Sequence, residues 1–286
     1  MESFYAKSVK KIWRVNNLNN VAEIMTSDPV TVNVDTQLTK VRSIFRDGGY
    51  RSIPVLSKTH LEGMITRGDM MFLSSTKSNI EARVIMERPK VLATPEMEME
   101  DIAKKLLKSN IVQVPVVEST ENMRLVGILS IGDILKKLLN NGSKSSNSNI
   151  ETIITKNVVK ANYDEHISKV WSLMDETGFS GLPVLKKNKI IGMITRKDII
   201  KSGHVRTGLD AVDKSIKVEK VMMTPPVVVT VETSITEAAE LMVEHDIGRL
   251  PVVENPVYIK KEPHRAREAK LIGIVAREDI LGSYIS

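Results

Sequence analysis

One short pattern occurs four times in this chain, and its repetition limits the possible folds more than any other feature. Each copy is a glycine, a strand-like apolar stretch and an aspartate six positions after the glycine, followed by an apolar run typical of a helix start. The copies occupy residues 63–69, 127–133, 192–198 and 273–279. A strand that ends where a helix begins is a good place to hold a ligand, because the helix N-terminus presents free N–H groups and the positive end of its dipole.

The spacing around this pattern is also constant. An apolar-Pro-Val triplet precedes each copy, with its proline at position 54, 115, 183 or 251. Sixteen residues before each proline stands an apolar residue, and eight residues earlier stands a valine. These valines are Val30, Val91, Val159 and Val227. A fixed period of tens of residues indicates four copies of one structural unit.

Each unit has the same predicted order of elements, β-α-β-β-α. The valine lies in a β-branched stretch predicted as a strand, at residues 30–32, 91–92, 158–159 and 227–229. An amphipathic helix follows, and in the first unit Leu38, Val41 and Phe45 share its apolar face. The proline-containing strand, a turn, the glycine-led strand and a second helix complete the unit. The fold class is therefore predicted to be α/β (α+β).

The units are expected to work in pairs. One unit of about 60 residues buries too little apolar surface to be stable alone. The only clear linker is a Ser- and Asn-rich stretch at 141–149, which divides the units two and two. The predicted segments are a lead segment at 1–19, units at 20–75, 80–140, 150–204 and 216–286, a packed connector at 201–217 and an insertion in the fourth unit at 254–270.

Composition excludes several classes of function. The chain has 286 residues, of which 42% are hydrophobic and 27% charged, a soluble globular balance without a run near the ~18 apolar residues of a membrane span. The absence of Cys excludes disulfides and thiol nucleophiles, and the five histidines are scattered, so no metal site is predicted. No catalytic or phosphate-loop motif is found, and the N-terminus lacks a signal peptide's apolar stretch. We therefore expect a cytoplasmic, non-enzymatic protein.

Two charged segments each allow two interpretations. The lead segment mixes four Lys and Arg residues with apolar ones, which favours a short element packed on the first domain over a basic membrane or nucleic-acid arm. The insertion mixes both signs of charge, which favours a solvated hairpin over a loop that contacts an acidic partner or a phosphate. The net charge of +6 permits nucleic acid as a partner but does not require it.

The aspartates that end the pattern also have two interpretations. They are Asp69, Asp133, Asp198 and Asp279, and the residues three positions before them are Thr66, Ser130, Thr195 and Ala276. A hydroxyl residue followed three positions later by a carboxylate predicts a capping box, which Ala276 cannot complete. Alternatively, each carboxylate accepts hydrogen bonds from a ribose diol, as in dinucleotide-binding proteins. The roles can coexist because a carboxylate has two oxygens.

The four units resemble the cystathionine β-synthase (CBS) domain in the apolar-Pro-Val strand and the strand-to-helix turn that ends in Asp. Two such domains form a Bateman module. Four in one chain resemble the γ regulatory subunit of AMP-activated protein kinase and its small archaeal and bacterial relatives. The resemblance implies two Bateman modules in a disk-like assembly that senses AMP, ADP or ATP. Other CBS modules bind S-adenosylmethionine or nucleic acid, and both stay open as alternatives.

The resemblance also implies binding residues. In the family the aspartate binds ribose, the hydroxyl residue orients ribose or phosphate, and adenine lies against the first strand of the partner unit. The implied pairs are Asp69 with Val91, Asp133 with Val30, Asp198 with Val227 and Asp279 with Val159. Because Ala276 lacks the hydroxyl, full occupancy of the fourth site is in doubt.

Cations for the phosphates are unevenly distributed. The family places basic residues two and three positions before the proline, and here only Arg51 and Arg249 occupy those positions. Further cations flank the ribose aspartates, namely Arg67, Arg196, Lys197 and Arg277. An arginine beside a helix N-terminus is well suited to a phosphate, so four unequal nucleotide sites are expected. Nucleic acid is the less favoured partner, no membrane is expected, and a regulated partner protein and a homodimer are both allowed.

Overall fold

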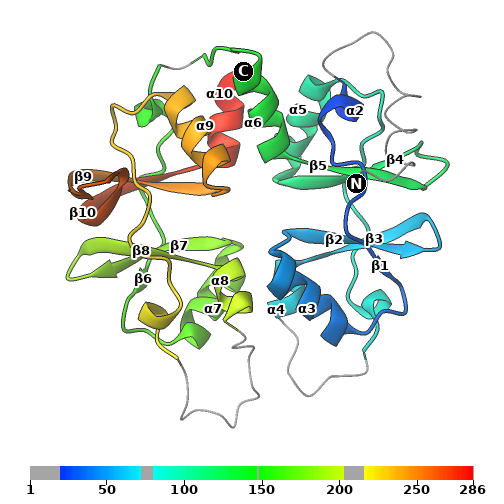
Figure 1. Cartoon of the computed structure of the whole chain (residues 1–286), viewed down its shortest axis with the longest axis horizontal. Coiled ribbons are helices and arrows are strands. Elements are labelled where there is room, and N and C mark those ends of the chain that lie inside the picture. The colour runs from blue at the N-terminus through cyan, green and yellow to red at the C-terminus, as the bar shows by residue number, and fades with distance from the viewer. Residues whose placement is uncertain (1–19, 72–79, 147, 203–215, 286) are drawn as a thin grey trace.

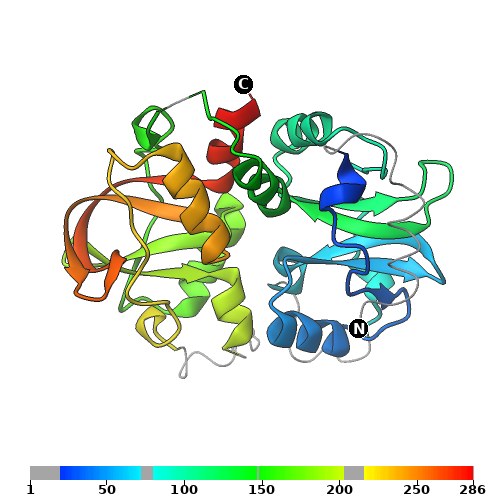
Figure 2. The same cartoon turned by 45° about the horizontal axis from the view of Figure 1, so that its top comes forward.

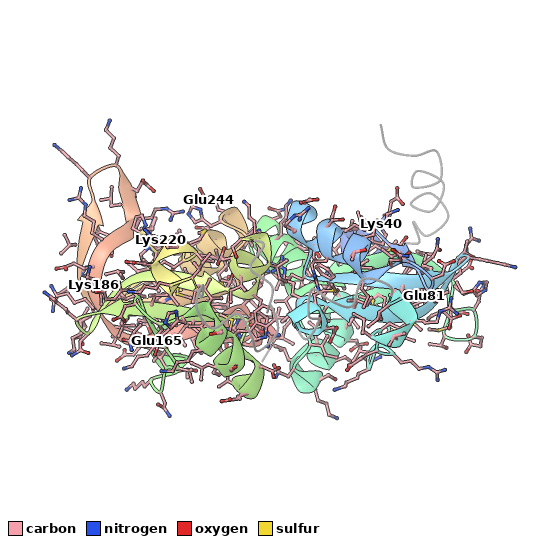
Figure 3. The ribbon with its side chains drawn as sticks, turned by 90° about the horizontal axis from the view of Figure 1, so that it is seen from below. Lys40, Glu81, Glu165, Lys186, Lys220 and Glu244 are labelled. Carbon is pink, nitrogen blue, oxygen red and sulfur yellow. The ribbon has the colours of Figure 1, made fainter. Side chains whose placement is uncertain are left out.

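The computed structural model of the chain describes residues 20–71, 80–146, 148–202 and 216–285. The predicted lead segment at 1–19 and most of the predicted connector at 201–217 lie outside these residues. Four α/β units occupy the corners of a square (Figure 1). Seen from its edge the molecule is flat, except where one long hairpin projects from it (Figure 3). The predicted α/β repeat architecture and its disk shape are therefore confirmed.

Each unit contains an antiparallel strand pair between two helices. The first has β1 (Val32–Asn33), α3 (Leu38–Gly48), β2 (Ser52–Ser57), β3 (His60–Thr66) and α4 (Arg67–Met71). The second has α5 (Met99–Ser109), β4 (Gln113–Val117), β5 (Leu125–Ser130) and α6 (Ile131–Asn140). The third has β6 (Ala161–Asn162), α7 (Ile167–Thr177), β7 (Gly181–Lys186), β8 (Lys189–Thr195) and α8 (Arg196–Lys201). The fourth has α9 (Ile235–Glu244), β9 (Arg249–Ile259), β10 (Glu262–Ala276) and α10 (Arg277–Ile285). Short helical turns α2 (Val21–Ile24), η1 (Ala82–Val84), η2 (Ile150–Thr152) and η4 (Val218–Lys220) precede the units.

The strand register explains the constant spacing in the sequence. In all four units the valine that follows the proline pairs with the glycine of the repeated pattern. The pairs are Val55 with Gly63, Val116 with Gly127, Val184 with Gly192 and Val252 with Gly273. The turn between these strands differs in length, and in the fourth unit it grows into the β9–β10 hairpin of the predicted insertion. The same register therefore delivers each aspartate to the same place in its unit.

The predicted first strands are shorter than expected. Parallel pairing is limited to Val32–Asn33 and Ala161–Asn162, and units two and four have only isolated bridges at Ala93 and Val229. Val30, Val91 and Val159 thus lie ahead of the strand rather than inside it, which corrects the prediction. A proline lies one residue before Val30 and two residues before Val91, and proline has no N–H to donate to a ladder. Val159 has no proline near it.

A short segment just ahead of each unit, which we call its crossing segment, holds the units of a pair together. Each crossing segment bridges to the glycine-led strand of the partner unit. The bridges join Thr26 with Ile128, Glu87 with Met64, Thr155 with Ile274 and Met223 with Met193. The pattern glycine allows this crossing, because a Cβ on Gly192 would lie 2.8 Å from the carbonyl oxygen of Met223. The exchange therefore joins the two units of each pair by backbone hydrogen bonds in both directions.

The two pairs of units meet through helices, and the two halves of this joint differ. Helices α5 and α6 pack against α9 and α10, and the buried residues of units two and four form one continuous apolar cluster (Figures 1 and 2). Units one and three keep separate clusters and meet mainly through α8, which packs on α3 and α4. Ile200 of α8 belongs to the apolar cluster of the first unit, whereas its neighbour Ile199 belongs to that of the third.

These adjacent isoleucines offer a matched test of the joint. Replacing either buried residue with alanine should lower the free energy of unfolding by about 2–5 kcal/mol, since both leave a cavity. Only Ile200→Ala should also loosen α3, and hydrogen exchange of the α3 amides measures this loosening. Equal exchange in α3 for Ile199→Ala and Ile200→Ala would show that α8 does not fasten units one and three.

Candidate functional site

The four strand-to-helix turns hold their aspartates in the same way. In each turn, one carboxylate oxygen, Oδ2, accepts a hydrogen bond from the backbone N–H three residues earlier. The distances are 2.6 Å from Thr66, 2.8 Å from Ser130, 2.9 Å from Thr195 and 2.8 Å from Ala276. The hydroxyls of Ser130 and Thr195 accept in return from the Asp133 and Asp198 N–H groups, which completes the predicted capping boxes. Thr66 and Asp69 make the same contacts, at 3.4 Å for the return bond.

Capping uses only half of each carboxylate. Within the part of the chain that the structure describes, no residue donates a hydrogen bond to the second oxygen, Oδ1, of these four aspartates. Burial raises the pKa of Asp198 and of Asp279, against the opposing effect of their backbone hydrogen bonds. An acceptor oxygen that is partly withdrawn from water gains from a donor in a ligand, because desolvation strengthens the hydrogen bond.

Three arginines lie immediately after the hydroxyl position and form a second shared feature. Each donates to a carbonyl at the C-terminal end of the first helix of its own unit: Arg67 to Gly49, Arg196 to Met174 at 2.7 Å, and Arg277 to Ile247 at 2.8 Å. A cation is favourable at this negative end of the helix dipole. The second unit has the apolar Ile131 at this position, so it supplies no such cation.

Two of these arginines, Arg196 and Arg277, reach across to the opposite pair of units. A Cβ on Gly68 would lie 2.9 Å from a guanidinium nitrogen of Arg196, and one on Gly132 would lie 3.1 Å from that of Arg277. Lys197 likewise reaches Gly49, where a Cβ would lie 3.0 Å from its Cε. Glycines in the turns of the first two units therefore make room for cations from the last two, so the turns of opposite units converge.

The convergence creates a cationic centre in which Arg277 is buried and Arg51, Arg67 and Arg196 are half-buried. Burial lowers the pKa of Arg67 to about 10, and the nearby charge of Arg51 contributes to this lowering. Burial also lowers the pKa values of Arg196 and Arg277. The Nε atoms of both Arg196 and Arg277 are buried and have no hydrogen-bond partner. Such a cluster of desolvated like charges favours a bound anion.

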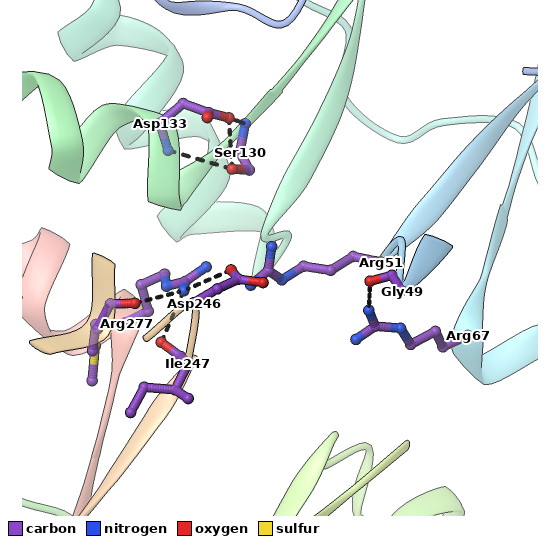
Figure 4. Close-up of polar contacts among 9 residues, drawn as sticks. Gly49, Arg51, Arg67, Ser130, Asp133, Asp246, Ile247 and Arg277 are labelled. Atoms are coloured by element: carbon purple, nitrogen blue, oxygen red, sulfur yellow. Dashed lines mark hydrogen bonds and ion pairs between the residues drawn. The ribbon is translucent and has the colours of Figure 1, made fainter. Parts of the chain in front are cut away.

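One carboxylate from the protein occupies part of this centre. Arg51 donates to Asp246 Oδ1 at 2.6 Å, and Arg277 lies 3.5 Å from the same oxygen (Figure 4). Burial alone would raise the pKa of Asp246, but the hydrogen bond and charge of Arg51 outweigh it, and the pKa is lowered. The predicted phosphate cation Arg51 thus points from the first unit to the fourth. Arg249 points from the fourth unit to the third, where it donates to Ser180 Oγ at 2.6 Å.

The predicted residues are not all equally close to this centre. The structure brings Arg51, Arg67 and Arg277 together, whereas Ser130 and Asp133 lie above them in the close-up and make contact only with each other there (Figure 4). Val30 is 40% exposed and Val227 is buried, with Val91 and Val159 between these extremes. The sequence reasoning missed Asp246 and the glycines Gly68 and Gly132. An aspartate at a helix end where the other units have Gly or Asn was the available signal for Asp246.

The repeated units match a known protein family. The model of the CBS domain matches residues 21–75, 81–140, 150–204 and 218–286. The chain belongs to the CBS domain family. We refer to its four units as CBS1 to CBS4, and to CBS1–CBS2 and CBS3–CBS4 as its two Bateman modules.

Archaeal proteins share this fold over nearly the whole chain. The chain is 26% identical over 280 residues to the uncharacterised protein MJ1225 of Methanocaldococcus jannaschii, a match that covers 88% of this chain and 94% of that protein. A crystal structure of MJ1225, described as a candidate archaeal homologue of γ-AMPK, has a TM-score of 0.76 at 24% identity and covers 92% of this chain and 99% of that one. An uncharacterised conserved protein from Pyrococcus horikoshii has a TM-score of 0.61 at 22% identity and covers 92% of this chain and 98% of that one. These likenesses show a shared fold.

Other classes of site find no support in the structure. No group of three or more His, Cys, Asp or Glu side chains suited to a metal ion occurs in the described ranges. Among the helices that the structure describes, none combines the length and apolarity that crossing a membrane requires.

Restoring the missing hydroxyl in CBS4 tests the capping role of the turn. Ala276→Ser should raise the free energy of unfolding by about 0.5–2 kcal/mol, because the serine can cap the Asp279 N–H. Thermal or urea unfolding without ligand measures the change. The reverse variant in CBS2, Ser130→Ala, should lower stability by a similar amount. If neither variant shifts the unfolding free energy, the capping boxes do not stabilise these helices.

Proposed function

We propose that this CBS protein binds adenine nucleotides between the paired CBS domains and acts as a non-enzymatic regulatory sensor. The observation that carries the proposal is a set of carboxylates, each with one oxygen left over from capping, beside a half-buried centre of arginines. Ribose needs acceptors for its two vicinal hydroxyls, and phosphates need cations. Asp69, Asp198 and Asp279 each interact electrostatically with an arginine of the centre, and AMP, ADP and ATP carry both a ribose and phosphate.

Ribose is assigned to the four pattern aspartates. Oδ1 of Asp69 or Asp198 can accept from one ribose hydroxyl, while Oδ2 keeps its place in the capping box. Thr66 and Thr195 help to orient the sugar. The backbone of the first-strand valines supports the assignment of adenine to them, because no backbone hydrogen bond joins Val30, Val91 or Val159 to another described residue. Their backbone groups are therefore available to an adenine ring.

Phosphate is assigned to the central cations Arg51, Arg67, Arg196, Lys197, Arg249 and Arg277. Arginine suits this role because its fork of donors matches two phosphate oxygens. The sites are unequal, because CBS4 lacks the turn hydroxyl at Ala276 and CBS2 lacks the turn arginine at Ile131. We place the strongest sites at Asp69 and Asp198, and weaker ones at Asp133 and Asp279.

The cationic centre also favours an adenine nucleotide over the two alternative ligands, S-adenosylmethionine and nucleic acid. S-Adenosylmethionine carries a net positive charge and no phosphate, so it would neutralise the arginines less well than a nucleotide. A nucleic-acid scaffold would need its basic residues on an open surface, whereas Arg277 is only 5% exposed. The likeness to MJ1225, described as a candidate homologue of γ-AMPK, supports an adenine nucleotide. Binding would act on a partner protein by favouring one packing of the two modules, which requires different affinities for the two states.

Asp198 separates a ligand role from a capping role. The parent protein for this test has the other three pattern aspartates changed to Asn and keeps Asp198. In this parent, Asp198→Asn should weaken AMP binding at least ~10-fold, about 1.4 kcal/mol. The reason is that the amide has lost the charge and one acceptor. Calorimetry with AMP and 2′-deoxy-AMP measures the effect. The parent, which keeps Asp198, should discriminate against the deoxy compound, and the Asp198→Asn variant should do so much less. The unfolding temperature without ligand should change little.

A matched control is available in the same domain. Asp164 lies in an exposed turn of CBS3, ahead of α7. Asp164→Asn removes the same charge and should leave AMP affinity unchanged. If Asp198→Asn binds AMP as tightly as the parent, the capping box fully accounts for Asp198 and the ribose assignment is wrong.

Arg249 tests the phosphate assignment. Arg249→Ala should weaken ATP and ADP by about 1.5–3 kcal/mol, because a charge-assisted contact is lost, with little effect on adenosine. Calorimetry with the three compounds measures the difference. The exposed Arg267 on the hairpin serves as a control of equal charge, and Arg267→Ala should alter none of the affinities. If Arg249→Ala loses equal affinity for adenosine and ATP, Arg249 stabilises the fold and does not contact phosphate.

A further inference from the structure

Asp246 stands at an unusual position in the fold. Five residues before the proline, each CBS domain has a residue in the left-handed backbone region that ends its first helix. These residues are Gly49, Asn110, Gly178 and Asp246, with φ values of 64°, 52°, 72° and 48°. Glycine and asparagine adopt this conformation readily and are common at helix ends. CBS4 alone has a charged residue there. The other three domains end the helix in the same backbone conformation without a carboxylate, so the helix end itself does not require one.

The carboxylate of Asp246 points into the cationic centre. It accepts a hydrogen bond from Arg51 of CBS1 at 2.6 Å, and Arg277 of CBS4 lies 3.5 Å from the same carboxylate oxygen (Figure 4). Its side chain is 61% exposed, whereas that of Arg277 is 6% exposed. The carboxylate is thus the accessible partner and can swing away, while the arginine is fixed in place by the Met242 and Ile247 carbonyls.

The arginines around Asp246 have more charge than it can neutralise. Arg51 interacts electrostatically with both Arg67 and Arg277, and all three interact with this one carboxylate. The buried Nε of Arg277 also has no hydrogen-bond partner. A phosphate group would bring up to two negative charges and three acceptor oxygens to the same place. It would therefore satisfy the arginines better than the carboxylate does.

We propose that Asp246 is a tethered competitor of ligand phosphate, which occupies the anion site between Arg51 and Arg277 until a nucleotide polyphosphate or another phosphate displaces it. Asp246 then sets the affinity threshold of the centre and discriminates by phosphate charge. The proposal rests on the proposed function for the identity of the nucleotide, but the anion site itself does not depend on an adenosine moiety.

Displacement would also have a structural consequence. The Arg51–Asp246 ion pair joins CBS1 to CBS4, diagonally across the two Bateman modules. A phosphate that takes Arg51 from Asp246 breaks this link and replaces it with a link through the ligand. Occupancy of the centre is thereby coupled to how the modules are joined, which is the coupling a sensor needs.

Asp246→Asn tests the proposal, because Asn110 already occupies the equivalent position in CBS2. Without the competing charge, ATP and inorganic pyrophosphate should bind about 3- to 10-fold more tightly, and adenosine should bind as before. Glu244→Gln removes a charge from the exposed end of the same helix and should change none of these affinities. Asp246→Gly, with the residue type found at Gly49 and Gly178, provides a second variant that keeps the backbone conformation. Calorimetry on the full chain gives all the values.

The outcomes distinguish this proposal from the proposed function. If the parent protein binds ATP and both Asp246 variants bind ATP and pyrophosphate no more tightly, the competitor role is wrong and nucleotide sensing stands. If no variant binds AMP or ATP but Asp246→Asn gains affinity for pyrophosphate, the anion site stands and the nucleotide assignment is wrong. An equal gain for adenosine would overturn the competitor role, since adenosine has no phosphate.

Discussion

The close passage of a crossing segment over the pattern glycine is the contact on which the rest of the structure depends. It joins two CBS domains that are each too small to bury a sufficient core. Because a side chain at Gly63, Gly127 or Gly192 would meet the backbone or side chains of the crossing segment, the glycine is needed for pairing rather than for a turn. The same passage leads the chain into the stretch that contains the first-strand valine. Pairing and the layout of the candidate site thus have one physical origin.

The regular features of this structure follow from local spacing and were predictable for that reason. The proline-to-valine register, the strand-to-helix turns and the capping of Asp133 and Asp198 depend on residues within a few positions of one another. The short first strands were mispredicted, because β-branched residues such as Val30 favour extended backbone whether or not a neighbouring strand pairs with them. Extended backbone without a ladder looks the same in sequence as a strand.

The cationic centre could be predicted only in part. Its arginines were named as phosphate cations, but the pairing of Arg51 with Asp246 joins residues 195 positions apart, and no local pattern specifies such a contact. The arginines also have a second role that sequence did not show. Arg67, Arg196 and Arg277 hold the carbonyl ends of their own first helices. A buried guanidinium has five N–H donors, so part of it can serve the fold while the rest stays available to a ligand.

The two halves of the joint between the modules differ, and this difference bears on how a ligand at the centre would affect the contacts between the modules. CBS2 and CBS4 share one continuous apolar cluster, which resists rearrangement because close-packed interiors have few alternative packings. CBS1 and CBS3 meet through α8 and through close contacts of Arg196 and Lys197 with the glycines of CBS1. Charged contacts respond to a bound phosphate, whereas an apolar cluster does not. Arg277 of CBS4 approaches Gly132 of CBS2 in the same way, so each joint presents a cation to a bound phosphate, and the CBS2–CBS4 joint is the one that a continuous apolar cluster holds fixed.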